Sequence, residues 1–266
     1  MKQILLLLAL VVALVPFVVV SAAAQRQGQV KPALGGYVLV PASPPIMAAL
    51  PPDLHPNANK PPEYCKPCLF YTGDMDPNSS ENNALFNADD GPLDITAYVY
   101  GAFTVPKGKI WTITALFINT LSNATAVDPT LTWDIRKGVT TGSGGTDVKT
   151  ATGKDTWAAT GRSAFGYSEY TNKVTFAKKI TLKAGTYFMN VLTSCTTSTC
   201  NGDEFYETDQ EHQPGINQYG ASQPWDDSYF YATNIDEVWV PTWGSNGVCG
   251  GIGCDQFSIG AQGTQK

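Results

Sequence analysis

Histidine and charged residues are scarce in this chain. Only two histidines occur among 266 residues, and Asp, Glu, Lys and Arg together make up 15%. Zinc hydrolases and imidazole-activated nucleophiles need clustered or partnered histidines. His55 lies in a proline-rich stretch, His212 lies in an acidic one, and no Gly-x-Ser-x-Gly motif is present. The sequence therefore predicts no catalytic residue.

Helical periodicity is also lacking, since no stretch repeats its apolar residues every 3.6 positions over several turns. Alternation with a period of two is present instead. Phe103 and Val105 alternate with Thr104, residues 106–109 (Pro-Lys-Gly-Lys) predict a turn, and alternation resumes over 110–118. The far end of the second strand is apolar on both faces, which predicts a position in the middle of a sheet.

A related pattern returns about eighty residues later. Ile180 and Leu182 lead into a turn at 183–185, and Tyr187, Met189 and Val191 then share one face. Two such hairpins predict an all-β fold of two antiparallel sheets packed face to face, a sandwich of jelly-roll type.

These two stretches, Phe-Thr-Val-Pro-x-Gly-x-x-Trp-Thr-Ile-Thr and Leu-Lys-Ala-Gly-Thr-Tyr-Phe, resemble secreted bacterial β-sandwich domains. Such domains recur in uncharacterised exported proteins, in carbohydrate-binding modules and at the C-termini of secreted peptidases. The resemblance covers residues 64–262 and implies the fold and an extracellular setting. It carries no catalytic motif that matches numbered residues here.

The N-terminus has the pattern of a secretory signal peptide. Lys2 precedes an apolar run over 4–20, and Ser-Ala-Ala-Ala follows at 21–24. We expect cleavage after Ala24 and a secreted or cell-surface protein, with a retained membrane anchor as the alternative. Nine prolines over 25–63 predict an extended arm, followed by one domain at 64–262 and a polar tail at 263–266.

Net charge limits the partners. Cleavage removes one Lys and no acid, which changes the formal charge from −6 to −7. Nucleic acids and anionic membranes both need clustered Lys and Arg, so neither is an expected partner of the mature chain.

The cysteines form three local pairs: Cys65 and Cys68, Cys195 and Cys200, and Cys249 and Cys254. Export favours three short disulfides. Half a zinc site or a thiol oxidoreductase motif at residues 65–68 is the alternative.

Calcium is the one cofactor that the sequence suggests. Asp74, Asp76 and Asn78 alternate as oxygen ligands do in the first half of a calcium loop. The second half of the loop does not match the calcium-binding pattern, because Ser79 occupies the position that requires Gly and Leu85 occupies the position that requires Glu. A loop of side-chain-capped turns is the alternative.

Two functions compete. Six aromatic residues could stack on sugar rings, which predicts a non-catalytic module that binds polysaccharide or a cell-surface protein: Trp157, Trp225, Tyr229, Tyr231, Trp239 and Trp243. The alternative is a glycoside hydrolase that uses the acids of residues 203–211, for which a solvated loop is the simpler interpretation. A carboxylate pair from distant strands, such as Asp134 and Glu169, would also serve a hydrolase.

Overall fold

A computed structural model describes the fold of the central and C-terminal parts of this chain. The described residues are 29–30, 38–40, 61–75, 84–90, 95–124, 127–195, 205–210, 218–220, 228–233, 237–242 and 256–266. No helix among them is long and apolar enough to cross a membrane.

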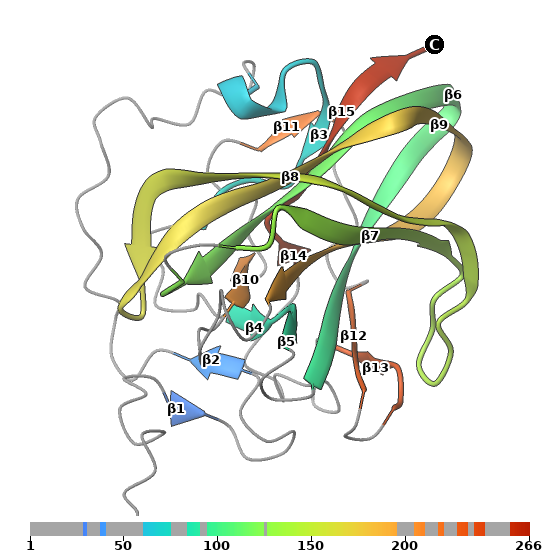
Figure 1. Ribbon diagram of the computed structural model, residues 1–266. Coiled ribbons are helices and arrows are strands. Elements are labelled where there is room, and N and C mark those ends of the chain that lie inside the picture. The colour runs from blue at the N-terminus through green and yellow to red at the C-terminus, as the bar shows by residue number, and fades with distance from the viewer. Residues whose placement is uncertain are drawn as a thin grey trace, which may run out of the picture.

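The described residues are nearly all in β-strands, as Figure 1 shows, and none lies in an α-helix. The strands are β1 (Gln29–Val30), β2 (Val38–Val40), β3 (Cys68–Tyr71), β4 (Ala84–Phe86), β5 (Ala88–Asp90), β6 (Ile95–Ser122), β7 (Thr130–Lys137), β8 (Thr146–Ala164), β9 (Tyr167–Cys195), β10 (Phe205–Gln210), β11 (Tyr219–Gly220), β12 (Tyr229–Ala232), β13 (Val240–Pro241), β14 (Gln256–Phe257) and β15 (Ile259–Gln265), with one 3-10 turn, η3 (Glu63–Cys65). The all-β class predicted from the sequence is confirmed.

One long ladder between β6 and β9 replaces the two hairpins that we expected. The two strands pair antiparallel from Gly101–Met189 to Ser122–Ser168. Val105 pairs with Gly185 and Ile110 pairs with Lys183, so residues 106–109 bulge out of a continuous strand and do not return the chain beside itself. The hairpin interpretation was therefore wrong. In Figure 1 both strands change direction together at the upper right, where the ladder folds over.

The second half of β6 is central, as the apolar pattern predicted. Residues 111–118 of β6 pair with β15 on the edge opposite β9. The first half of β6 pairs with β12 over residues 97–100. One pairing, between β5 and β9, is parallel, and the sheet is therefore mixed and open.

The core lies within the fold of this ladder. Phe70 stacks on Phe103 at 5.1 Å and on Trp111 at 5.7 Å between ring centroids, which joins β3 to both halves of β6. Tyr187 of β9 stacks on Phe103 at 5.7 Å. Each such ring contributes about 1.5–3 kcal/mol by leaving water, so this stack stabilises the bend of the ladder.

β7 buries Leu131, Trp133 and Ile135 on one face. A short connection at 138–145 then leads to β8, which begins at Thr146. The expected polar tail at 263–266 is not separate from the domain, because β15 continues to Gln265 and Lys266 bonds the backbone of Ile110.

Candidate functional site

An aromatic surface covers the outer face of the first half of the ladder. Val99 and Phe103 of β6 point into the core, so Tyr98 and Tyr100 point to the opposite face. The register places Tyr231 beside Tyr98 and Tyr229 beside Tyr100. We call this surface the aromatic face, which consists of Tyr98, Tyr100, Phe188, Tyr229, Tyr231 and Trp239.

Three of these rings form a row that is partly exposed. The ring centroids of Tyr98 and Tyr231 lie 6.1 Å apart. Tyr231 stacks on Trp239 with 5.1 Å between ring centroids and an interplanar angle of 22°. Tyr98, Tyr231 and Trp239, which we call the aromatic row, are all partly exposed, whereas Tyr100 and Tyr229 are buried beneath them. The buried rings support the exposed ones, so the row is preformed.

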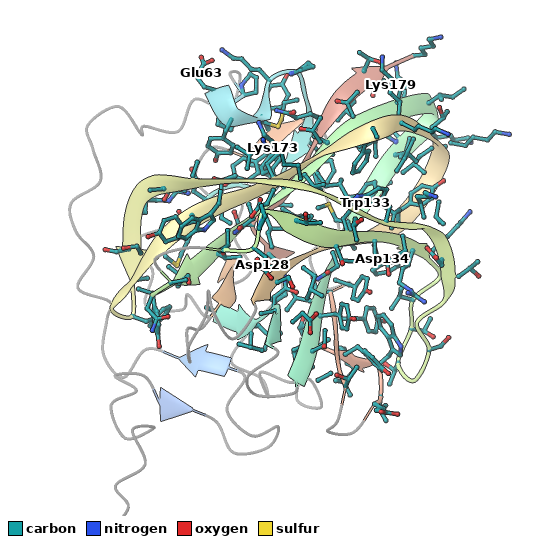
Figure 2. All side chains as sticks on the ribbon, in the orientation of Figure 1. Glu63, Asp128, Trp133, Asp134, Lys173 and Lys179 are labelled. Atoms are coloured by element: carbon teal, nitrogen blue, oxygen red, sulfur yellow. A yellow bond between two sulfur atoms is a disulfide. The ribbon has the colours of Figure 1, made fainter. Side chains whose placement is uncertain are left out.

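A polar network of three residues adjoins the row. Tyr100 donates its hydroxyl to Asp134 Oδ2 at 2.9 Å, and Arg136 Nη1 lies 2.9 Å from the same oxygen. The Arg136 guanidinium lies 5.2 Å from the Trp239 ring centroid and 6.0 Å from that of Tyr100. Figure 2 shows Asp134 on β7 with aromatic rings gathered beneath it.

Burial sets the electrostatics of this network. It raises the pKa of Asp134, and the hydrogen bonds from Arg136 and Tyr100 oppose that rise. Burial, with the nearby charge of Asp134, also raises the pKa of Tyr100, so this tyrosine stays a neutral donor at neutral pH. Asp134 Oδ1 finds no hydrogen-bond donor among the described residues.

The loop between β7 and β8 holds Trp239 in place. Gly142 N donates to the carbonyl of Trp239 at 2.8 Å, and Arg136 Nε donates to the carbonyl of Gly144 at 2.6 Å. A Cβ on Gly144 would lie 2.5 Å from two ring atoms of Trp239. Only glycine therefore allows the ring to lie this close to the loop.

Of the other three predicted tryptophan ligands, the structure describes Trp157, which does not join this row. Trp157 stacks on Tyr170 at 4.0 Å, where β8 pairs with β9, and its indole Nε1 has no hydrogen-bond partner among the described residues. Trp225 and Trp243 lie outside the described residues. Of the six predicted residues, the structure brings together Tyr229, Tyr231 and Trp239, and Tyr229 is buried.

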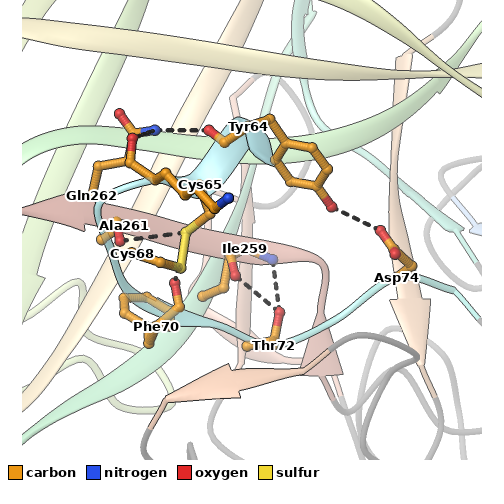
Figure 3. Close-up of a disulfide and its surroundings, with 10 residues drawn as sticks. Tyr64, Cys65, Cys68, Phe70, Thr72, Asp74, Ile259, Ala261 and Gln262 are labelled. Atoms are coloured by element: carbon orange, nitrogen blue, oxygen red, sulfur yellow. Dashed lines mark hydrogen bonds between the residues drawn. A yellow bond between two sulfur atoms is a disulfide. The ribbon is translucent and has the colours of Figure 1, made fainter. Parts of the chain in front are cut away.

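A second arginine network lies inside the protein and includes Asp74 of the predicted calcium loop. Asp74 Oδ1 accepts hydrogen bonds from Tyr64 and Tyr71, and Arg162 Nη2 lies 2.7 Å away. Figure 3 shows the Tyr64 contact beside the neighbouring disulfide. The Arg162 charge opposes a cation at Oδ1. Asp76 and Asn78 lie outside the described residues, so the calcium site stays a prediction.

Glu169 completes this interior network. Its Oε2 accepts hydrogen bonds from Arg162 and from Thr160, while Oε1 has no partner among the described residues. Burial raises the pKa of Glu169, and the charge of Arg162 opposes the rise. Glu169 and Asp134 thus belong to separate networks, each bound to its own arginine. The structure does not bring them together as a hydrolase pair.

The acidic stretch 203–211 is not the loop that we expected. Residues 205–210 form β10, which pairs with β4, β6 and β14. The side chains of this strand, and His212, lie outside the described residues, so the hydrolase alternative stays untested.

One predicted disulfide is present. Cys65 and Cys68 are bonded, which confirms the disulfide interpretation for this pair over zinc or free thiols. The side chains of Cys195, Cys200, Cys249 and Cys254 lie outside the described residues.

Sequence reasoning missed Tyr98, Tyr100 and Arg136, and it named Asp134 only as half of a hydrolase pair with Glu169. A signal for the two tyrosines was present, because residues two apart in a strand share a face. For Asp134 and Arg136 the spacing shows a shared face, but only the fold shows that this face meets the aromatic row.

Comparison with protein-family models, with curated proteins and with solved structures finds no match to this chain.

Proposed function

We propose that this protein is a secreted, non-catalytic module that binds carbohydrate through the aromatic row. The observation that carries the proposal is the partly exposed row of Tyr98, Tyr231 and Trp239, with ring centroids 6.1 and 5.1 Å apart. Sugar rings present apolar C–H faces, and these pack on aromatic planes. Hydroxyl groups around the same ring need hydrogen-bond partners, which Arg136 can supply.

Preorganisation supports this function. Tyr100 and Tyr229 pack beneath the row, and the β7–β8 loop fixes Trp239. A surface that is already ordered loses little conformational entropy when a ligand binds. Binding sites combine apolar walls with a few well-placed polar groups, and Arg136 beside the row fits that description.

The setting of the domain is part of the proposal. Residues 1–24 would direct export, residues 25–63 would space the domain from a surface, and the domain would fold as a two-sheet jelly-roll sandwich. The partner would be a polysaccharide or a cell-surface protein. Calcium at Asp74, Asp76 and Asn78 would have a structural role only.

The proposal is tested with purified protein and a panel of insoluble polysaccharides. We expect retention on at least one of them, and a loss of at least tenfold in Trp239→Ala and in Tyr231→Ala. Trp157→Ala is the matched control, because it removes a partly buried, stacked tryptophan elsewhere in the fold, and its retention should equal that of the wild type.

Two results would contradict the proposal. The first is no retention on any polysaccharide. The second is release of reducing sugar that disappears in Glu204→Gln or Glu207→Gln, which would make the acidic stretch an active site.

A further inference from the structure

We infer that the aromatic row selects saccharides without charge and that Arg136 is the residue that determines this specificity, an inference that rests on the proposed function. The charge around the row, and the way in which Arg136 is already bound, carry this inference.

Anionic saccharides meet no net positive charge from the described residues of this face. Arg136 touches the face, but Asp134 lies 2.9 Å from its Nη1 and neutralises it. Two further acids add negative charge near the same residues. Desolvation raises the pKa of Tyr98 and of Asp134, and the charge of Asp89 adds to the rise at Tyr98, as the charge of Asp147 does at Asp134. Lys137, the next basic residue along β7, lies over Tyr187 and not over the row. A carboxylate or sulfate on the ligand would therefore be repelled.

Cationic saccharides meet a different obstacle. A cation gains most when it lies over an aromatic ring from which water has been removed. The guanidinium of Arg136 already occupies that position over both Trp239 and Tyr100. An amino group on the ligand would have to displace Arg136, and the buried Asp134 would then lose its partner. We therefore expect no gain from a positive charge on the sugar.

A neutral sugar ring with hydroxyl groups suits the remaining N–H donors of Arg136. Arg136 uses Nε for the Gly144 carbonyl and Nη1 for Asp134, out of five N–H donors. Its side chain is 23% exposed, so the other donors can reach a ligand that lies on Trp239. These donors are held in a fixed plane, and they would choose among neutral sugars by the positions of their hydroxyl groups.

The experiment compares retention of the full chain on three insoluble polymers of matched particle size: a neutral β-glucan, a polymer of glucosamine and a cross-linked polyuronate. We expect retention on the neutral polymer to exceed retention on either charged polymer at least tenfold. Because no charge is paired on binding, retention should change less than about twofold between about 0.05 and 0.5 M NaCl.

Two variants test whether Arg136 is responsible for the selectivity. Arg136→Lys keeps the charge but removes the planar donors, so retention on the neutral polymer should fall about fivefold or more while the protein still unfolds in one cooperative transition. Lys137→Gln is the control, because it removes a neighbouring charge outside the row, and it should bind as the wild type does.

Each possible result decides the inference. Stronger retention on either charged polymer, a steep salt dependence, or unchanged binding by Arg136→Lys would overturn it while leaving carbohydrate binding intact. Absence of retention on all three polymers, and on the wider panel, would overturn the proposed function together with this inference.

Discussion

Two arginine–carboxylate networks in this protein are built from the same residue types and differ in their access to solvent. The Arg162 side chain is 2% exposed and lies between two carboxylates, Asp74 and Glu169. The Arg136 side chain is 23% exposed and pairs with one, Asp134. Tyrosine hydroxyls donate to a carboxylate in both networks.

Burial distinguishes the Arg162 network, which has a structural role, from the Arg136 network, which we propose contacts a ligand. Inside the protein, the Arg162 network joins η3, β3, β8 and β9, and it extends through Tyr71 to Asn119 of β6 and to Ser258. Its donors are used to hold the chain together. At the surface, the Arg136 network keeps some donors accessible beside exposed rings, so the same chemistry can serve a ligand.

The largest expected effect comes from removing the interior arginine. Arg162→Met leaves Asp74 and Glu169 buried without a counter-ion, which typically costs about 3–5 kcal/mol. Arg136→Met leaves one buried carboxylate, Asp134, without its cation, but Asp134 keeps the hydrogen bond from Tyr100 and water can reach the partly exposed position 136. We therefore expect a smaller loss of about 1–2 kcal/mol. Denaturant unfolding under non-reducing conditions measures both.

Glu169→Gln keeps this comparison testable even if Arg162→Met does not fold. The interior network formally holds one positive and two negative charges, so a neutral isostere at residue 169 should leave stability unchanged or raise it. A loss of more than about 2 kcal/mol in Glu169→Gln would mean that Arg162 needs both carboxylates as anions, and that the network is stable with its one excess negative charge.

The sequence predicted the strands of this fold better than it predicted their pairing. Alternation identified the all-β class, the central position of residues 111–118 and the shared face of Tyr187, Met189 and Val191. The Pro and Gly at 106–109 are equally compatible with a hairpin and with a bulge. The partner strand, some seventy residues away, decides between them, and local pattern cannot show it.

The candidate site was only partly predictable, again because local sequence pattern does not show which distant strands pair. Aromatic content and position pointed to Tyr231 and Trp239. The charged residues at the site, Asp134 and Arg136, belong to a strand whose neighbour is β9, so their meeting with β12 depends on long-range pairing. Asp74 was predicted as a metal ligand because the spacing of oxygens was visible, while Arg162 is 88 positions away.

A fourth buried carboxylate, Asp155, has no arginine beside it and extends the comparison. Asp155 on β8 is 8% exposed, and neither of its oxygens makes a hydrogen bond of normal geometry within the described residues. Burial raises its pKa to about 7, slightly offset by the backbone N–H groups of Lys173 and Thr156. Without a counter-ion, the proton itself neutralises the group.

The sign of the pH effect follows from this rise. The folded protein holds the Asp155 proton more tightly than the unfolded chain does, so the contribution to stability is full below about pH 4 and is lost as pH rises through 7. Asp155→Asn removes this dependence. We expect the variant to match the wild type at pH 4 and to exceed it by about 1–2 kcal/mol at pH 8, since partial solvent screening reduces the effect.

Unfolding curves of wild type and Asp155→Asn across pH 4–8 give the difference directly, because all other groups titrate in both. Thr152→Ala, which changes an exposed and uncharged side chain on the same strand, should give a flat difference. A flat difference for Asp155→Asn as well would show that this carboxylate is ionised and solvated in the folded protein.

The smallest effect on stability, and a specific effect on binding, is expected at Gly144. An added Cβ would lie 2.5 Å from Cε2 and Cζ2 of Trp239, so the ring must move away from the loop. Because the loop and the ring are at the surface, the ring can shift at a cost of less than about 1 kcal/mol in unfolding free energy. Thr141→Ala, at an exposed position in the same loop, is the control.

Binding should respond more strongly than stability does. Trp239 is one end of the aromatic row, and a displaced ring changes both its stacking on Tyr231 and its contact with Arg136. We therefore expect Gly144→Ala to reduce retention on the neutral polysaccharide about threefold to tenfold, because a small misplacement of one anchor lowers affinity without removing it. If Trp239→Ala abolishes retention while Gly144→Ala binds normally, the row functions without its loop support, and the surface arginine network is then no more than a structural contact, like its interior counterpart.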